Sequence, residues 1–304
     1  MKRAVIDVGS NSLILLIAER QGQEWVPIAE HTRITGLGIG AKATGNLRSE
    51  SIRDTLQALT DLFEISRQAG ADDPIAAATM AVRIAKNQQE FLELAAANQT
   101  PVVVVSGDEE ARLGFEAVAN DPLFASSCRI SIVDPGGNST ELMTCDRVAA
   151  GWQTRFKRSY PVGGLGLRDG VLKDEAPDFA ARLNAVEEID NIIGLDYLPN
   201  QHGTTIVLGA TGTNLISIRE AMTTWNPDVV HGATLDYEEV GRAVGWLCSL
   251  GDEGRRNVVG LQPGRERTIH IGSLILERFL QALHTWECKV SIRGWRHAFL
   301  SEID

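Results

Sequence analysis

Two short polar turns in this 304-residue chain combine an acidic residue with glycine and small hydroxyl or amide side chains. The first is Asp7-Val8-Gly9-Ser10-Asn11-Ser12, and the second is Asp134-Pro135-Gly136-Gly137-Asn138-Ser139-Thr140. Glycine lets the backbone approach a ligand closely, and successive N–H groups with small polar side chains can cradle phosphate oxygens. The carboxylate before each turn would repel phosphate unless a cation lay between them, and Mg²⁺ prefers such oxygen ligands. The turns therefore predict a magnesium-assisted phosphate site.

Each turn lies between two apolar segments that are typical of β-strands. Residues 4–8 and 13–18 flank the first turn, and residues 130–133 and 140–144 flank the second. One turn of this kind is common in ordinary hairpins. Two of them, 134 − 7 = 127 residues apart and each at the start of an α/β segment, indicate a duplicated unit. The pair implies two domains that face each other, each contributing a phosphate clamp to one cleft.

Alternating helices and strands follow each hairpin. After the first, a third strand over 25–34 precedes a helix whose apolar residues over 52–65 recur every three to four positions. A Val-rich strand at 102–105 and a helix from about residue 108 end this half. The order restarts near residue 129, and the aperiodic stretch 120–127 marks the boundary. We therefore predict domains at 1–124 and 125–304, with a last helix that can pack back on the first domain.

Composition restricts the class of protein. Hydrophobic residues at 43% and charged residues at 23% are typical of a globular chain. A net charge of −11 argues against broad binding of nucleic acid or anionic membranes. The four cysteines show no paired metal-ligand spacing, and the apolar run at 13–18 is too short to cross a bilayer. We expect a cytoplasmic protein with no nucleic-acid or membrane partner.

Further candidate residues lie next to predicted strands, and each has a plain structural alternative. Glu110 lies in Ser106-Gly107-Asp108-Glu109-Glu110-Ala111-Arg112, at the carboxyl end of a strand, where α/β folds bind ligands. The three acidic residues Asp108, Glu109 and Glu110 could equally stabilise the amino end of a helix. Glu141 is a metal-ligand candidate or a solvent-facing strand residue, and Arg83, which follows a predicted strand, taken alone is a surface arginine. The Gly209-Ala210-Thr211-Gly212 turn before a helix is a third phosphate loop or a purely structural turn.

The chain resembles the actin, sugar kinase and Hsp70-type ATPase superfamily. Within it, the chain resembles the exopolyphosphatase and guanosine pentaphosphate phosphohydrolase (Ppx/GppA) family in a short two-domain form. The segments that carry the resemblance are residues 6–12, 106–112 and 133–141, with weaker similarity at 209–215 and 231–232. The resemblance implies an α/β fold of two duplicated actin-like, ribonuclease H-like domains that flank an interdomain cleft. It also implies a Mg²⁺-dependent release of terminal phosphate from inorganic polyphosphate or guanosine pentaphosphate, and a homodimer.

The resemblance also implies roles for individual residues. Glu110 would be the catalytic base, and Arg83 would stabilise charge on the transferred phosphoryl group. Asp134 and Glu141 would hold the metal, with Asp7 contributing from the other turn. The remaining residues would bind phosphate oxygens, namely Gly9, Ser10, Asn11, Ser12, Gly136, Gly137, Asn138, Ser139, Thr140, Gly209, Thr211 and Gly212.

The sequence departs from the family pattern in two places. Pro135 and Asn138 stand where the family usually has an aliphatic residue and a third glycine, and Pro135 removes a backbone donor. The stretch 290–298 lacks the usual acidic residues. These departures motivate an alternative function, a catalytically weakened phosphate or nucleotide sensor on the same fold. A small-molecule kinase on this scaffold is disfavoured, because it would need an acidic base in a substrate pocket and usually a longer chain.

Overall fold

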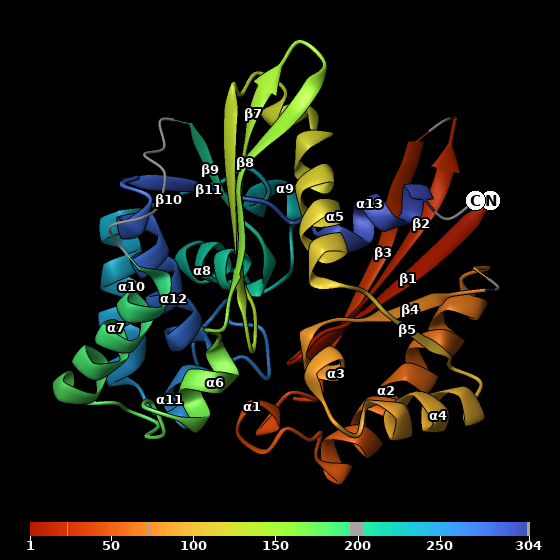
Figure 1. Cartoon of the computed structure of the whole chain (residues 1–304), viewed down its shortest axis with the longest axis horizontal. Helices are drawn as coiled ribbons and strands as arrows, with labels where there is room; N and C mark the ends of the chain where they lie inside the picture. Colours follow the sequence, from red (N-terminus) through yellow and green to blue (C-terminus); the bar gives the residue numbers. More distant parts are fainter. Residues whose placement is uncertain (23, 72, 195–202, 303–304) are drawn as a thin grey trace. The chain divides into compact units, whose positions relative to one another are not determined.

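The computed structural model describes residues 1–22, 24–71, 73–194 and 203–302 (Figure 1). The chain forms two compact units, unit 1 from Met1–Ala117 with Gly294–Asp304 and unit 2 from Val118–Arg293. The chain thus passes into unit 2 once and returns to unit 1 for its last helix. The domain boundary that the sequence predicts between residues 124 and 125 stays a prediction.

Unit 1 is built on a five-stranded sheet with the order β3-β2-β1-β4-β5. The strands are β1 (Lys2–Val8), β2 (Ser12–Gln21), β3 (Glu24–Ile34), β4 (Ile75–Ala78) and β5 (Val102–Val104). The first three form an antiparallel meander, and β4 and β5 run parallel to β1. The carboxyl ends of β1, β4 and β5 therefore lie at one edge of the sheet, the edge that carries turn 1 (residues 9–12).

The helices of unit 1 cover this sheet. They are α1 (Ala41–Thr44), α2 (Ser49–Gln68), α3 (Met80–Ile84), α4 (Gln88–Ala97), α5 (Gly107–Ala119) and α13 (Trp295–Glu302). The apolar stripe of α2 is buried at Ile52, Leu56, Leu59 and Leu62, as its spacing predicts. At the other end of the chain, Trp295 and Leu300 of α13 pack in one cluster with Val5 of β1 and Leu16 of β2.

Unit 2 contains a six-stranded sheet with the order β10-β11-β9-β6-β7-β8. The strands are β6 (Arg129–Pro135), β7 (Thr140–Val148), β8 (Gly151–Tyr160), β9 (Thr204–Val207), β10 (Thr234–Asp236) and β11 (Glu287–Val290). The first three again form an antiparallel meander, and β9 and β11 run parallel to β6. Turn 2 (residues 136–139) joins β6 to β7.

The helices of unit 2 pack around one apolar core. They are η1 (Pro122–Phe124), α6 (Gly164–Asp169), α7 (Phe179–Ile193), α8 (Gly209–Arg219), α9 (Pro227–Val230), α10 (Tyr237–Ser249), α11 (Asp252–Arg256) and α12 (Ile269–Ala282). The central one is α12, which is buried along most of its length and packs against α10, α7 and α8. Its apolar residues join those of β6, β7 and β9 in the core.

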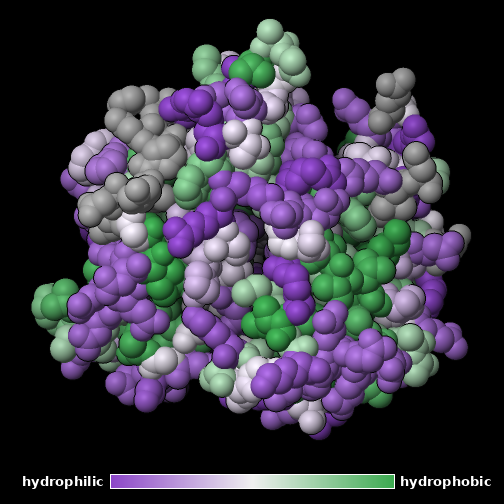
Figure 2. Space-filling model, viewed as in Figure 1, coloured by the Kyte–Doolittle hydropathy of each residue, from purple (hydrophilic) through white to green (hydrophobic). Residues whose placement is uncertain are grey.

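The two sheets confirm the predicted duplication. The arrangement β8-β7-β6-β9-β11 of unit 2 repeats the strand order and directions of β3-β2-β1-β4-β5 in unit 1, and β10 extends it at one edge. The fold class is α/β, as the sequence predicts. On the face shown in Figure 2, polar residues predominate and apolar residues form separate patches. Among the described helices, none combines the length and the apolar character needed to cross a membrane.

Candidate active site

Turn 1 is held by hydrogen bonds that leave little room for a side chain at its first residue, Gly9. The Gly9 N–H donates to the Ser12 carbonyl at 3.0 Å, and a Cβ on Gly9 would lie 3.0 Å from the same oxygen. The carbonyl of Ser10 accepts from the Gly38 N–H at 2.7 Å, and that of Asn11 accepts from Gly36 at 3.0 Å. The glycine-rich segment after β3 therefore fixes the carbonyl side of turn 1.

Turn 2 repeats this geometry at the equivalent positions. The Gly136 N–H donates to the Ser139 carbonyl at 2.8 Å, and a Cβ on Gly136 would lie 2.9 Å from that oxygen. The Gly137 carbonyl, equivalent to that of Ser10, accepts from the Leu165 N–H of α6 at 2.7 Å. Asn138 and Ser139 are buried. The Thr140 hydroxyl donates to the Val162 carbonyl at 2.7 Å, so its side chain ties β7 to the segment after β8.

Unit 2 differs from unit 1 in carrying a pair of carboxylates beside its turn. Asp134 lies directly opposite Glu141 in the β6–β7 register, whereas Asp7 lies opposite Ile14 in the β1–β2 register. Directly opposed residues of antiparallel strands project from the same face with their Cβ atoms about 5 Å apart. The Ser159 hydroxyl of β8 donates to Glu141 Oε1 at 2.8 Å. Two hard oxygen donors therefore flank turn 2.

This pair fits a metal ion that shares its coordination with the ligand. Within the described ranges, no three Asp, Glu, His or Cys side chains gather as a complete metal site. Magnesium commonly takes only one or two carboxylates and completes its shell with water and phosphate oxygens. Asp134 and Glu141 match that donor set. Asp7 belongs to unit 1, and its part in holding the metal stays a prediction.

The segment from Gly209 to Gly212 begins a helix and does not form a separate loop. Helix α8 starts at Gly209, four residues before the predicted start near Thr213. Gly209 has a φ of +73°, and a Cβ there would lie 2.8 Å from Asp134 Oδ1. The amino end of α8 therefore lies against Asp134, where its N–H groups favour anions.

Two residues predicted to bind phosphate in this segment are buried in the helix packing. Thr211 packs against α12, because a Cβ on Gly272 would lie 2.4 Å from its Oγ1. A Cβ on Gly212 would lie 2.6 Å from the side chain of Val207. Packing of α8 on α12 and β9 accounts for both residue types, and their phosphate role stays a prediction.

In unit 1, α5 places an acidic side chain beside an arginine. Ser106 precedes α5, its hydroxyl accepts from the Glu109 N–H at 3.1 Å, and its carbonyl accepts from the Glu110 N–H at 2.9 Å. Arg83 Nη1 lies 3.3 Å from Glu110 Oε2, and the two side chains are only 24% and 16% exposed. Arg83 also donates to the Val105 carbonyl at 2.8 Å. The structure thus brings the predicted base and the predicted phosphate-binding arginine together.

Glu109 has a different environment from its neighbour. It pairs with Arg112 at 2.6 Å, and Arg112 also binds Glu116 of α5 and Glu302 of α13. The hydrogen bonds from Arg112 lower the pKa of Glu109. This half-exposed network is a surface ion-pair cluster, and it separates the structural acid Glu109 from Glu110.

Asp7 carries a buried carboxyl oxygen next to turn 1. Its Oδ1 has no hydrogen-bond partner in the part of the chain that the structure describes. Burial raises the pKa of Asp7 to about 7, opposed by the charge of Arg296 and a hydrogen bond from Trp295. An orphaned buried carboxyl oxygen is costly unless it receives a donor or a cation. Asp7 therefore fits the predicted site of turn 1.

A further polar cluster in unit 2 was not found by sequence reasoning. Buried Asp121 lies 2.9 Å from His231 Nε2 and 3.2 Å from Arg293 Nε. Its other carboxyl oxygen accepts from the Leu123 N–H at 3.0 Å and so caps η1. His231 therefore has a structural role here. The three residues lie far apart in sequence, and no local pattern links them.

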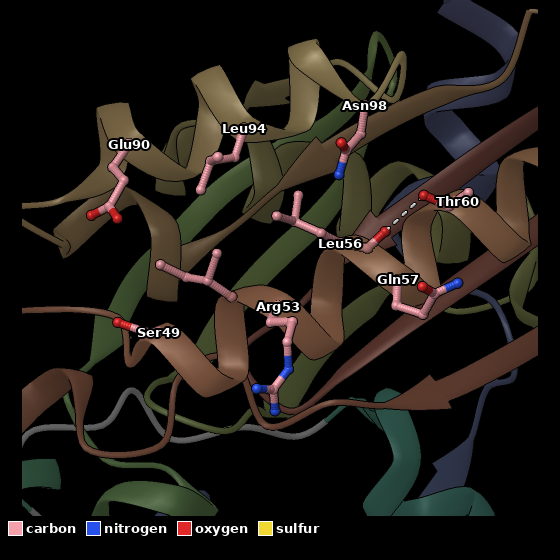
Figure 3. A pocket seen from close by; sticks show the side chains of 9 residues that line it. Ser49, Arg53, Leu56, Gln57, Thr60, Glu90, Leu94 and Asn98 are labelled. Atoms are coloured by element: carbon pink, nitrogen blue, oxygen red, sulfur yellow. Dashed lines mark hydrogen bonds between the residues drawn. The ribbon is translucent and has the colours of Figure 1, made fainter.

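A pocket of about 310 Å³ lies in unit 1 between α2 and α4 (Figure 3). Its apolar lining residues are Ile52, Leu56 and Leu94, and polar side chains such as Arg53 and Glu90 also line it. None of the predicted site residues lines it. The pocket is therefore separate from the residues predicted to carry the chemistry.

Known proteins are similar to this chain in sequence and fold over nearly its whole length. The Ppx/GppA phosphatase family matches residues 16–303. Exopolyphosphatase 2 of Mycobacterium tuberculosis is 28% identical over 297 residues, which cover 92% of this chain and 90% of that protein. The crystal structure of an Aquifex aeolicus Ppx/GppA family member has a TM-score of 0.78 at 27% identity, covering 99% of this chain and 97% of that chain.

A third relative agrees at the level of the fold. An exopolyphosphatase from Cytophaga hutchinsonii has a TM-score of 0.84 at 20% identity, covering 99% of this chain and 96% of that chain. Both units accordingly have the actin-like α/β fold of these structures. The chain belongs to the Ppx/GppA phosphatase family and is a phosphoanhydride hydrolase.

Proposed function

We propose that this protein is a magnesium-dependent hydrolase that releases the terminal phosphate of inorganic polyphosphate or of guanosine pentaphosphate. The observation that carries the proposal is the grouping in unit 2 of Asp134, Glu141, turn 2 and the amino end of α8. Carboxylates for a metal and N–H groups for phosphate lie together there. The similarity to Exopolyphosphatase 2 supports polyphosphate as a substrate.

The proposed reaction moves one phosphoryl group to water. The water oxygen forms a bond to the terminal phosphorus, and the bond from that phosphorus to the bridging oxygen breaks. Glu110 accepts the proton of the water, and the shortened chain leaves with the bridging oxygen. Turn 1 and turn 2 bind phosphate oxygens, and Arg83, next to Glu110, stabilises the charge that develops on the transferred group. A magnesium ion held by Asp134 and Glu141 would neutralise phosphate oxygens.

The alternative, a phosphate sensor, rests on the substitutions at Pro135 and Asn138. Pro135 is accommodated at the end of the β6–β7 ladder, opposite Thr140. The hydrogen bond that closes turn 2 has the same donor and acceptor positions as the one in turn 1. Because turn 2 keeps its geometry despite both substitutions, the structure favours the hydrolase over the sensor.

The test measures the release of phosphate from tripolyphosphate, long-chain polyphosphate and guanosine pentaphosphate, each with and without Mg²⁺. We expect release that requires Mg²⁺. Glu110→Gln should lower kcat by about 10²- to 10⁴-fold, since it removes a general base. The matched control is Glu109→Gln in the next position of α5, which should keep most of the activity.

Two results would count against this proposal. Magnesium-dependent binding without release from any of the three substrates would favour the sensor. Equal losses in the Glu110 and Glu109 variants would remove the assignment of the base and leave the acids as helix-stabilising residues.

A further inference from the structure

A glycine-rich loop of unit 1 lies against turn 1 and ends at an exposed arginine, Arg48. This loop, residues 35–48, follows β3 and is anchored to turn 1 by the hydrogen bond from Gly38 to the Ser10 carbonyl. Gly40 has a φ of +72°, and a Cβ there would lie 2.8 Å from both Nε and Nη2 of Arg48. The guanidinium of Arg48 therefore packs against the loop backbone while remaining accessible to solvent.

A lysine from the turn between α3 and α4 lies against the same loop. The Lys86 N–H donates to the Gly45 carbonyl at 2.8 Å, and a Cβ on Gly45 would lie 3.2 Å from Lys86 Cε. Lys86 follows α3, the helix that carries Arg83, and α3 packs on α1 (Figure 1). Two exposed cations thus lie against the loop, Arg48 at Gly40 and Lys86 at Gly45.

Neither cation forms an ion pair with the described residues. In the ranges that the structure describes, no carboxylate pairs with the side chain of Arg48 or Lys86, whereas Arg53, a turn further along α2, pairs with Asp54 at 3.3 Å. The chain as a whole carries a net charge of −11. Two unpaired cations against a loop fixed to a phosphate-binding turn are a local attraction for an extended anion, because charge interactions act over about 10 Å.

We propose that Arg48 and Lys86 bind the phosphates of linear polyphosphate that lie beyond the terminal groups held at turn 1. This inference rests on the proposed function. Polyphosphate carries a negative charge at every phosphate, so the proposal concerns the part of a long chain that extends beyond its terminal groups, and tripolyphosphate is the short comparison. The fork of Arg48 suits bidentate phosphate contacts, and Lys86 acts as a point charge.

The experiment compares the KM for long-chain polyphosphate with the KM for tripolyphosphate. The double variant Arg48→Ala/Lys86→Ala should raise the KM for the long chain by about five- to tenfold at low salt, since two exposed charge contacts are lost. Its kcat and its KM for tripolyphosphate should stay unchanged. The rise should shrink as salt is added. Arg48→Lys/Lys86→Arg, which keeps both charges, should restore most of the affinity.

Arg53→Ala is the matched control, because Arg53 is an exposed arginine on α2 that already has a partner. An equal KM rise in this control would overturn the inference, and so would an unchanged ratio of the two KM values in the double variant. A rise confined to guanosine pentaphosphate would also overturn it. Wild-type protein that releases no phosphate from any polyphosphate would instead refute the proposed function, which separates the two failures.

Discussion

At the scale of single residues, Gly209 controls how closely the amino end of α8 approaches Asp134. Its positive φ of +73° disfavours any side chain, and a Cβ would stand 2.8 Å from the Asp134 carboxylate. The two constraints can be separated, because Gly194 has a similar φ of +69° and no described residue lies within 4 Å of its would-be Cβ. Gly209 therefore has a positional role beyond backbone freedom.

We predict that Gly209→Ala displaces the Asp134 carboxylate, raises the Mg²⁺ concentration needed for half-maximal activity and lowers kcat by at least about tenfold. Gly194→Ala should cost about 1 kcal/mol of unfolding free energy, like any alanine at such a φ, and leave activity intact. Magnesium titrations of phosphate release and urea unfolding of both variants measure the two effects. Equal activity in both variants would contradict the positional role of Gly209.

The elements were predictable where a pattern extends over several residues. The hairpins around turn 1 and turn 2 follow from apolar, β-branched segments, and the stripe of α2 follows from helical spacing. Their order indicates the duplicated fold. Short helices such as α3 and α6 have too few residues to show a period. Helix α8 begins before its predicted start, because a helix that begins in glycine and threonine lacks an apolar signal.

The chemistry of the site was predictable only in part. The resemblance picked Glu110 over Glu109, and the structure supplies the physical difference, since Glu110 lies beside Arg83 and Glu109 beside Arg112. The burial of Thr211 against α12 and the meeting of Asp121, His231 and Arg293 depend on contacts between distant segments. No sequence window contains such contacts.

Helix α12 carries a histidine that resists protonation. His270 is fully buried, and both ring nitrogens lack hydrogen-bond partners in the part of the chain described. Burial lowers its pKa to about 2, helped by the charges of Arg255 and Arg168. The unfolded chain, with a histidine pKa of about 6.5, binds one more proton than the folded chain as soon as the pH falls below that value. Acid therefore favours unfolding.

We predict that His270 makes the wild-type protein about 2 kcal/mol less stable at about pH 5 than at about pH 7. His270→Leu should remove this part of the pH dependence while keeping the apolar packing of α12. Urea unfolding at both pH values measures the difference. His284→Asn, at an exposed histidine with a φ of +51°, should keep the wild-type pH dependence. The same slope in wild type and His270→Leu would show that other groups cause it.

At the scale of the whole molecule, the last helix belongs to the unit formed by the start of the chain. Trp295 and Leu300 of α13 are 5% and 1% exposed, in one cluster with Val5 and Leu16. The positive charge of Arg296 and the side chain of Trp295 both lower the pKa of Asp7, against the larger effect of burial. The two ends of the chain are thus needed together to complete the sheet packing and the surroundings of turn 1.

We predict that Trp295→Ala destabilises unit 1 by about 3–5 kcal/mol, the usual cost of truncating a buried tryptophan. Hydrogen exchange should show the loss in β1 and β2, while α12 and β9 of unit 2 keep their protection. Trp286→Ala is the matched control, since Trp286 is 77% exposed and lies in unit 2, and it should leave β1 and β2 protected. Equal loss of protection in both units of the Trp295 variant would mean that they unfold as one body, and the return of the chain to unit 1 would then have no separate role in its stability.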